Sequence, residues 1–427
     1  MALCGFNEVF LTLAVSALVL QAFLLFLALF EPELPYRLSR RLDAEIDSPE
    51  FVRLLAVIGD SQAYRGTRVE VLTNGEAFYE AELEAIRAAQ TSVHLEAYIF
   101  LSGEVTRRFL SVLTERAAAG VEVKLVIDAI GSFTMRNSRF RELRAAGGQI
   151  GWYHPMHWDT WPRINNRTHR EILIVDGSVG FVGGAGFADH WLVPKGRRRR
   201  WRDTMFRVEG DTVAALESTF AENWLESSGE LLAPAQLPER STGEAVALVI
   251  NSSPSGRSTR CRMVVQTLLA CARDSIAITT PYFLPDRSAR EEMVRAIRER
   301  GVRITVITPG RHHDHLLTRR SSRRLYGDLL RSGAEIYEYS PAMIHAKVML
   351  IDGCWSLVGS ANFDHRSFSL NDEVNLAVLD TAVAARLARD FARDVASSRR
   401  VTYAEWRRRA LVERVSEWLG WVLERQQ

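Results

Sequence analysis

The feature that most constrains this chain is a long internal repeat. The segment THREILIVDGSVGFVGGAGF at residues 168–187 aligns without a gap with IHAKVMLIDGCWSLVGSANF at residues 344–363, so equivalent positions lie 176 residues apart. Two preceding blocks repeat in the same order, 92–128 with 275–308 and 143–155 with 329–341. Three matched blocks in one order indicate a duplicated unit, so we expect the chain to fold as two related halves.

Each half carries short β-branched apolar runs that alternate with helical stretches, which is typical of an α/β fold. We therefore expect a mixed sheet flanked by helices in each half, with two tandem domains related by pseudo-twofold symmetry. A stretch rich in Pro, Ser and Gly at about 234–258 predicts the boundary between them. The predicted parts are an N-terminal membrane anchor at 1–35, a first domain at 45–235, a second domain at 245–400 and an amphipathic C-terminal helix at 401–427.

The N-terminal region departs from the composition of a globular domain. Residues 9–30 form an apolar run that is long enough to cross a ~30 Å hydrocarbon core as a helix. The rival is a cleaved signal peptide, but no basic residue precedes the run and no small residues follow it. Arginines at 37, 40 and 41 follow the run, so the positive-inside rule predicts one span in the inner (cytoplasmic) membrane with the domains facing the cytoplasm.

The second copy of the repeat carries the pattern His-x-Lys-x-x-x-x-Asp followed by Gly-Ser-x-Asn. Its residues are His345, Lys347, Asp352, Gly359, Ser360 and Asn362. Side chains two residues apart on a strand point to the same face, so His345 and Lys347 can reach one phosphate together. This pattern resembles the signature of the phospholipase D superfamily, which implies two phospholipase D-like domains that share one site.

A histidine on an apolar strand is usually a satisfied core residue, but here His169 stands at the position equivalent to His345. Paired histidines fit a mechanism in which one attacks phosphorus to form a phosphohistidine and the other protonates the leaving oxygen and then activates the acceptor. Downstream, Asp203 and Glu373 are the candidates to orient the two imidazoles. The motif carboxylates Asp176 and Asp352 belong to the candidate set too, with bracing of a turn and the neighbouring half as the role expected of them.

The first copy departs from this pattern at three positions. Glu171 stands in place of the phosphate-binding lysine, and Gly184 and Gly186 replace Ser and Asn. An ionised carboxylate would repel a phosphodiester unless it is neutralised or paired. Arg167, two residues before His169, would share its strand face and could supply the missing cation or pair with Glu171.

The resemblance narrows when further motifs are included, and these look like bacterial cardiolipin synthases. They are Tyr98-Ile-Phe, Asp128-Ala-Ile-Gly131-Ser, Trp201-Arg-Asp203, Thr280-Pro-Tyr282-Phe, Gly359-Ser-Ala-Asn362-Phe-Asp364-His-Arg366-Ser and Leu370-Asn371-Asp-Glu373. The resemblance implies transfer of a phosphatidyl group from a phospholipid donor, such as phosphatidylglycerol, to the hydroxyl of phosphatidylglycerol, with release of a small alcohol. It further implies that His169 is the nucleophile and His345 the acid/base, or the reverse, and that Lys347, Ser360 and Asn362 contact the phosphate.

Other features bear on partners. The net charge of +2 lacks the excess expected of a protein that binds nucleic acid, so phospholipids and the membrane are the expected partners. The arginine run 197–200 and the aromatic stretch 406–422 would suit a lipid surface, or a solvated loop and a helix docked on the core. The four cysteines lack CxxC spacing and the His312-His-Asp-His315 cluster is expected to face solvent, so we expect neither a metal nor another cofactor.

Two other functions fit the same residues. A phospholipase D that uses water as acceptor would carry the same motif. Glu171 could instead mark a catalytically impaired, membrane-bound lipid-binding protein.

Overall fold

The computed structural model describes residues 11–23, 36–39, 44–155, 163, 165–192, 200–232, 241–253, 260–410 and 413–414. The first half contains, in chain order, β1 (Tyr64–Thr73), α3 (Gly75–Ala88), β2 (Ser92–Ala97), α4 (Glu104–Ala118), β3 (Glu122–Asp128), η1 (Asn137–Phe140), α5 (Arg141–Ala145), β4 (Gln149–Tyr153), β5 (Ile172–Val175), β6 (Val179–Gly183), η3 (Asp189–Trp191), β7 (Thr204–Glu209) and α6 (Thr212–Ser228).

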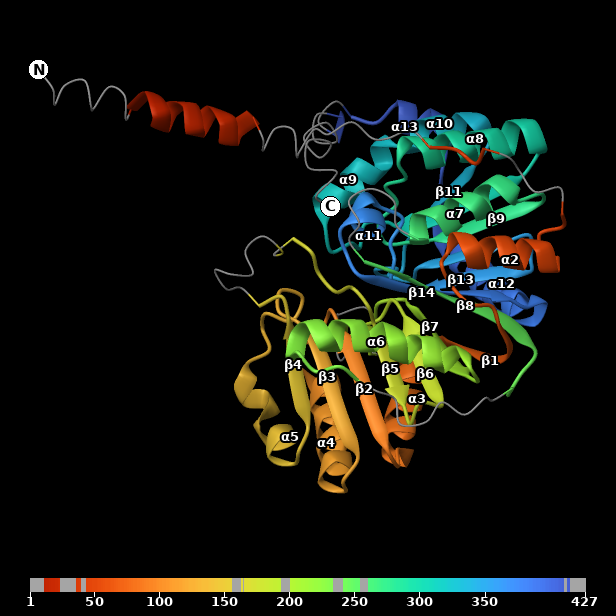
Figure 1. The fold of residues 1–427 in the computed structure, drawn as a ribbon. Coiled ribbons are helices and arrows are strands. Elements are labelled where there is room, and N and C mark those ends of the chain that lie inside the picture. Colours follow the sequence, from red (N-terminus) through yellow and green to blue (C-terminus); the bar gives the residue numbers. More distant parts are fainter. Residues whose placement is uncertain are drawn as a thin grey trace, which may run out of the picture.

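The second half repeats this order and adds elements at its end. It contains β8 (Ala245–Ser252), α7 (Arg260–Cys271), β9 (Ser275–Thr279), α8 (Arg287–Arg300), β10 (Arg303–Pro309), α9 (Leu316–Arg324), α10 (Tyr326–Ser332), β11 (Glu335–Tyr339), β12 (Val348–Ile351), β13 (Trp355–Gly359), α11 (His365–Ser369), β14 (Glu373–Leu379), α12 (Thr381–Ala396), β15 (Ser398–Val401) and α13 (Tyr403–Arg407). Figure 1 shows this half above the first.

The two halves have the same strand order, which confirms the duplicated mixed sheet. The order is β4-β3-β2-β5-β6-β7-β1 in the first half and β11-β10-β9-β12-β13-β14-β8 in the second, with β15 added beside β11. In each half three neighbouring strands are parallel, β2 to β4 and β9 to β11, and the others pair antiparallel. Antiparallel pairing of β1 with β8 joins the halves, so the strands of the described residues form one continuous order.

Local sequence accounts for the elements around the repeat. β5 and β12 are runs of four apolar residues buried on both faces, because a hairpin partner and covering helices enclose each strand. Helix α8 begins where Asp286 accepts a hydrogen bond from the backbone N–H of Ala289, and it ends at Gly301, whose φ of 71° suits a residue without a side chain.

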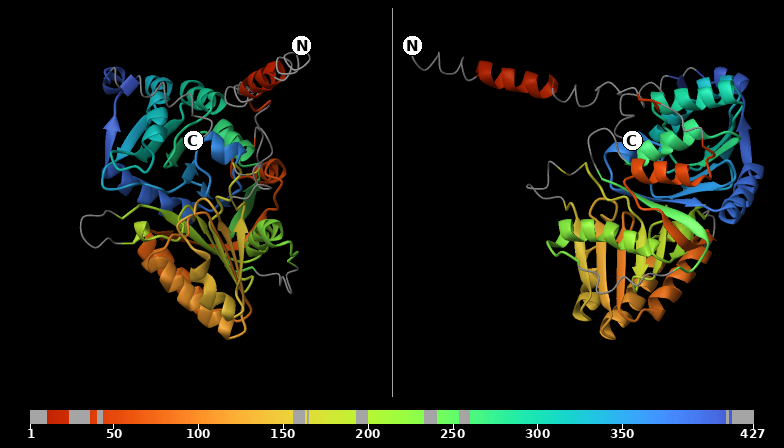
Figure 2. Two further views of the ribbon diagram at one scale, coloured as in Figure 1. Left: turned by 90° about the vertical axis from the view of Figure 1, so that its left-hand side faces the viewer. Right: turned by 45° about the vertical axis from the view of Figure 1, so that its right-hand side comes forward.

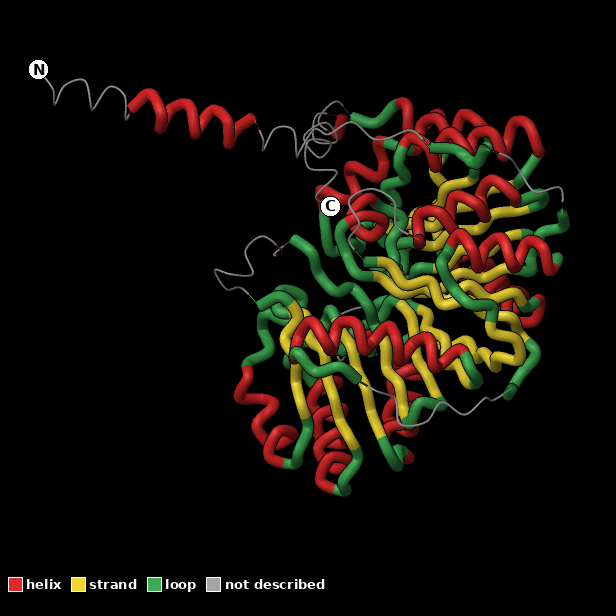
Figure 3. Tube along the Cα trace, in the orientation of Figure 1, coloured by secondary structure: helices red, strands yellow, loops and turns green. Residues whose placement is uncertain are grey.

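Three apolar cores are present among the described residues, and one of them joins the halves. One lies between the first-half sheet and α3 and α4, and a second lies between the second-half sheet and α7, α8 and α10. The third draws residues from both sheets and from α6 and α12, for example Phe220, Val374 and Leu387. The strands of each half are covered by helices in Figure 3, and Figure 2 shows the two halves stacked in two further views.

Helix α2 (Pro49–Ile58) packs on the second half, although the predicted division assigned residues 45–235 to the first domain. Its buried face, Phe51, Val52 and Leu55, belongs to the core of the second half, together with Leu268 of α7. The reason is that α7 and its strands leave an apolar surface that the N-terminal segment covers. The chain thus crosses from the second half to the first at β1.

Two predictions concern the ends of the chain, and the described residues cover only part of each. Residues 11–23 are helical with exposed apolar side chains, but no helix within the described residues is long and apolar enough to cross a bilayer. The rest of the predicted span, 9–10 and 24–30, lies outside them. At the other end Trp406 is docked on the second half, where its Nε1 donates to the carbonyl of Arg323 at 2.7 Å. Residues 415–427 also lie outside the described residues.

A buried charge network on β2 and α6 gives a test of the fold. His94 Nδ1 lies 2.8 Å from a carboxylate oxygen of Glu217, and Nε2 lies 3.2 Å from Glu122. Burial lowers the pKa of His94, but the two carboxylates outweigh it and raise the pKa to about 9. The folded-state pKa exceeds the unfolded value, so the imidazolium contributes stability fully below about pH 6.5 and loses it as the pH rises through about 9.

We therefore expect the unfolding free energy to fall by about 3 kcal/mol between pH 6 and pH 10 through this group. Chemical denaturation of wild type and His94→Phe at both pH values measures it. The phenylalanine keeps the stacking on Phe220, whose ring centroid lies 4.9 Å from that of His94. An equal pH dependence in the two proteins would contradict the assignment.

Candidate active site

The two motif histidines lie at the interface between the halves, and backbone hydrogen bonds fix them there. The N–H of His169 donates to the carbonyl of Asp372 at 2.8 Å, and the N–H of His345 donates to the carbonyl of Arg202 at 2.7 Å. Each bond joins one half to the other, and the two bonds involve equivalent positions of the repeat. Each histidine is therefore placed by the half to which it does not belong.

The carboxylate that contacts each histidine also comes from the opposite half. His169 Nδ1 lies 3.0 Å from Oε2 of Glu373, and His345 Nδ1 lies 2.9 Å from Oδ2 of Asp203. An ionised carboxylate can only accept, so each Nδ1 carries the proton and each Nε2 carries the lone pair. The sequence proposed these two acids, and the structure decides which histidine each one meets.

Further donors hold both carboxylates. Asp203 accepts from Trp191 Nε1 at 3.0 Å and from the N–H of Thr204 at 2.8 Å, and Ser360 Oγ donates to Glu373 at 2.5 Å. Burial raises the pKa of Asp203, but the hydrogen bond and charge of His345 outweigh burial and lower it. Asp203 therefore stays ionised. The predicted contact of Ser360 with substrate is replaced by this bond, because its hydroxyl is buried against Glu373.

Lys347 lies against His345 in the buried centre. Its Nζ is 2.8 Å from Nδ1 and 3.1 Å from Nε2 of His345, and it donates to the carbonyl of the same residue at 2.9 Å. Burial and the charge of Lys347 lower the pKa of His345, with Asp203 opposing them. Burial also lowers the pKa of Lys347, and neighbouring carboxylates, Asp203 first, oppose it. His345 is therefore neutral at neutral pH before substrate binds.

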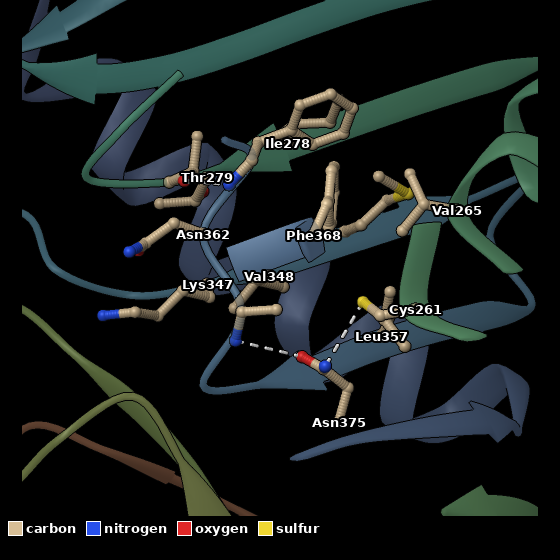
Figure 4. Close-up of a pocket in the computed structure, with 14 residues that line it drawn as sticks. Cys261, Val265, Ile278, Thr279, Lys347, Val348, Leu357, Asn362, Phe368 and Asn375 are labelled. Atoms are coloured by element: carbon tan, nitrogen blue, oxygen red, sulfur yellow. Dashed lines mark hydrogen bonds between the residues drawn. The ribbon is translucent and has the colours of Figure 1, made fainter. Parts of the chain in front are cut away.

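Asn362 lies beside Lys347, as expected from the motif. Both side chains line a cavity of about 30 Å³ whose other walls are mostly apolar, among them Ile278 and Phe368. Figure 4 shows the ends of Lys347 and Asn362 directed to the same side. Oδ1 of Asn362 is buried and meets no hydrogen-bond partner among the described residues. The amide nitrogen of Asn362 and the ammonium of Lys347 are both donors, so together they are suited to the oxygens of a phosphate.

Aromatic rings form the walls around both histidines. Ring centroids of Trp191 and Trp201 lie 5.5 and 5.3 Å from that of His345, and Tyr98 lies 5.1 Å from His169. Tyr98 and Trp201 belong to the motifs of the sequence, whereas Trp191 was missed. No spacing in the sequence indicates it, since it reaches the site through the short helix η3.

Glu171 occupies the position of the missing lysine and turns back into the first half. Its Oε1 accepts a hydrogen bond from the N–H of Ile99 at 3.2 Å, while Oε2 is buried without a hydrogen-bond partner among the described residues. Burial raises the pKa of Glu171 well above its ordinary value. The carboxyl group is therefore held neutral, which removes the expected repulsion of a phosphodiester.

The glycines of the first copy make room for these side chains. A Cβ at Gly184 would lie 2.6 Å from Cδ of Lys347, and a Cβ at Gly186 would lie 2.6 Å from the carbonyl oxygen of Ile99 and 2.9 Å from Oε1 of Glu171. The three departures from the motif are thus connected. Gly184 accommodates the lysine of the other half, and Gly186 accommodates Ile99 together with the glutamate that Ile99 binds.

Arg167 does not take the predicted role. Its Nε donates to Asp128 at 2.9 Å, and its other nitrogens donate to the carbonyls of Tyr153 and His154 at 2.9 Å each. This buried ion pair braces the chain that leads to His169. Contrary to the prediction, Arg167 neither pairs with Glu171 nor supplies the missing cation, because Asp128 at the end of β3 attracts it more closely.

The motif aspartates lie at the far ends of their strands. Asp352 follows β12 and accepts from the N–H groups of Arg273, Asp274 and Ser275, each at 2.8 Å. Asp176 does the same for residues 90–92. They brace the turn that begins β9 or β2 in their own half, so they do not act on the neighbouring half and do not belong with the catalytic residues.

We expect Asp352→Ala to destabilise the protein by about 2–4 kcal/mol, because three N–H groups lose their acceptor. The turnover of the molecules that remain folded should stay within about twofold of wild type. Thermal unfolding and a steady-state assay on the same preparation measure both quantities, with Asp176→Ala as the matched variant. A hundredfold loss of turnover in folded protein would return Asp352 to the catalytic set.

Comparison with known proteins agrees with this geometry. The family model described as "Cardiolipin synthase, PLD-like domain" matches residues 83–224 and 265–395. The major cardiolipin synthase ClsA of Bacillus subtilis is 31% identical over 379 residues, which cover 88% of this chain and 78% of that protein. Cardiolipin synthase 1 of Staphylococcus epidermidis is 32% identical over 386 residues, with 88% and 78% covered.

Solved structures share the fold at low sequence identity. Phosphatidylserine synthase of Haemophilus influenzae superposes with a TM-score of 0.68 at 13% identity and covers 88% of this chain and 100% of that one. Polyphosphate kinase of Porphyromonas gingivalis gives a TM-score of 0.54 at 12% identity, with 88% and 53% covered. These similarities concern the arrangement of the two halves.

Proposed function

Because this chain belongs to the phospholipase D-like cardiolipin synthase family, we propose that it makes cardiolipin by a double displacement between His169 and His345. It is a phosphatidyltransferase, and phosphatidylglycerol is the proposed donor and acceptor. The observation that carries the mechanism is the exchange of carboxylates: each histidine is oriented by an acid of the other half, at 3.0 and 2.9 Å.

In the first step Nε2 of His169 attacks the phosphorus of one phosphatidylglycerol. A P–N bond forms, the P–O bond to the headgroup breaks, and His345 gives its proton to the glycerol oxygen that leaves. His169 is assigned as nucleophile because its Nε2 has no hydrogen-bond partner among the described residues, whereas Lys347 lies 3.1 Å from Nε2 of His345. The bound phosphate brings the negative charge that favours protonation of His345.

In the second step a second phosphatidylglycerol enters in place of glycerol. His345, now neutral, takes the proton of its terminal hydroxyl, the hydroxyl oxygen attacks phosphorus, and the P–N bond breaks to release cardiolipin. Lys347 and Asn362 hold the phosphate oxygens in both steps. Glu373 keeps the imidazole of His169 oriented throughout.

Placement at the membrane completes the proposal. Residues 9–30 anchor the chain in the inner membrane as a single span, and the arginines that follow keep the two domains on the cytoplasmic side. The exposed apolar helix at 11–23 supports this placement.

The test is a product assay with the purified full chain in phosphatidylglycerol vesicles, wild type beside His345→Gln. We expect cardiolipin and glycerol in equal amounts from wild type and neither product from the variant. Phosphatidic acid without cardiolipin would show that water is the acceptor and the enzyme is a phospholipase. No turnover across several phospholipids would indicate a lipid-binding protein.

A further inference from the structure

Two loops that occupy equivalent places in the halves carry exposed apolar side chains. Phe133 lies in the loop after β3 and is 77% exposed. Leu316 and Leu317 follow the loop after β10 and are 45% and 44% exposed. β3 and β10 have the same position in the two strand orders, so the repeat presents apolar groups twice in related places.

Both loops follow strands whose carboxyl ends lie at the same sheet edge as the histidines. β5 pairs with β2 so that Ile172 is opposite Glu96, which places His169 at the edge of the sheet where the parallel strands β2 and β3 end. Ser132, next to Phe133, donates to the carbonyl of Tyr98 at 2.8 Å, and Tyr98 contacts the ring of His169.

The second half repeats these contacts. Val348 of β12 is opposite Thr279 at the end of β9, so His345 also lies where parallel strands end. The hydroxyl of Tyr282 donates to Asp314, two residues before Leu316, and the charge of Asp314 reaches His345 and Lys347.

The same loops carry exposed positive charge. Arg136 and Arg139 follow Phe133, and Arg311 precedes Leu316; all three side chains belong to exposed residues. Apolar side chains next to arginines are the combination that favours the boundary between acyl chains and anionic headgroups. In a soluble loop, by contrast, a large aromatic side chain in water contributes nothing to folding.

The histidines themselves are recessed, with side-chain exposures of 14% for His169 and 6% for His345. A phosphodiester in a bilayer can reach them only if the entrance is held against the lipid surface. We propose that Phe133, Leu316 and Leu317, here called the mouth rim, insert into the interface of an anionic bilayer and hold the entrance over the headgroups. This inference rests on the proposed function, since it takes a bilayer phospholipid as substrate.

The first experiment compares two forms of the same substrate. The full chain is reconstituted in phosphatidylcholine vesicles and assayed either with long-chain phosphatidylglycerol in the bilayer or with monomeric dihexanoyl phosphatidylglycerol in solution. For Phe133→Ser/Leu316→Ser/Leu317→Ser we expect roughly tenfold or more loss with the bilayer substrate, because three apolar groups no longer enter the lipid, and unchanged turnover of the monomeric substrate. Val57→Ser, which alters a side chain 80% exposed on α2, is the matched control and should change neither rate.

An equal loss of turnover with both substrates, or no loss with either, would show that the mouth rim does not contact the lipid. A change in sedimentation of the variant would overturn it as well, since the apolar loops would then cover a second copy of the chain.

A second measurement separates the rim from the chemistry. An NBD fluorophore on Phe133→Cys, with Cys4 and Cys271 replaced by serine, should shift to the blue on vesicles of phosphatidylglycerol, and the same label on Val57→Cys should not. A blue shift in a protein that forms no cardiolipin would support insertion of the mouth rim into lipid and would contradict the proposed function. Absence of a shift in an active enzyme would reject the rim alone.

Discussion

We expect the replacement of His345 by glutamine to lower cardiolipin formation by on the order of 10⁴-fold, and the replacement of His169 by glutamine to do the same. The reason is that each imidazole supplies the lone pair or proton on which both displacement steps depend. A glutamine amide can still donate to Asp203 or Glu373, so the buried carboxylates keep a partner. Radiolabelled phosphatidylglycerol in vesicles measures the rate, and circular dichroism checks the fold.

The double variant should lose no more activity than either single variant, because the two groups act as one unit. Asp203→Asn and Glu373→Gln are the companion variants and should lose on the order of 10²- to 10⁴-fold, since the neutral amide no longer fixes the tautomer of its histidine. More than a tenth of the wild-type rate in a correctly folded His345→Gln protein would rule out the double displacement.

Replacing Glu171 by lysine restores the motif in sequence, yet we expect it to lower turnover by about a hundredfold and stability by about 2–4 kcal/mol. The lysine cannot accept from the N–H of Ile99, and it would place a second ammonium near Lys347 in a buried region. Turnover in the vesicle assay and the midpoint of thermal unfolding are the two measurements.

Glu171→Gln is the matched variant. Its amide oxygen can accept from Ile99 as the carboxyl oxygen does, and it copies the neutral state that burial imposes on Glu171. We expect turnover within about threefold of wild type and little change in stability. A gain of turnover in Glu171→Lys would instead show that the glutamate impairs the site. A large loss of turnover in Glu171→Gln would show that the carboxyl group takes part in the chemistry.

Glu82 supports the view that this region tolerates neutral carboxyl groups. It is buried on α3, burial raises its pKa well above the ordinary value, and it acts electrostatically on Glu171. Burial favours the protonated form of both carboxyl groups, and for Glu171 the charge of Lys347 opposes it.

The sequence by itself determined the duplicated α/β fold, the two histidines, the lysine and the asparagine. These follow from strand and helix periodicity and from motifs within about twenty residues, which are local properties of the chain. The positions of Asp176 and Asp352 at strand ends were also predictable, because an Asp-Gly pair after an apolar run makes a tight turn.

The tertiary structure alone decided how the site is assembled. His345 and Asp203 are 142 residues apart and His169 and Glu373 are 204 apart, and only the packing of the halves makes them neighbours. The same packing drew Arg167 to Asp128, turned Glu171 toward Ile99 and laid α2 on the second half. Such choices depend on which buried polar groups find partners and which apolar faces remain to be covered, and both are set by contacts between distant segments.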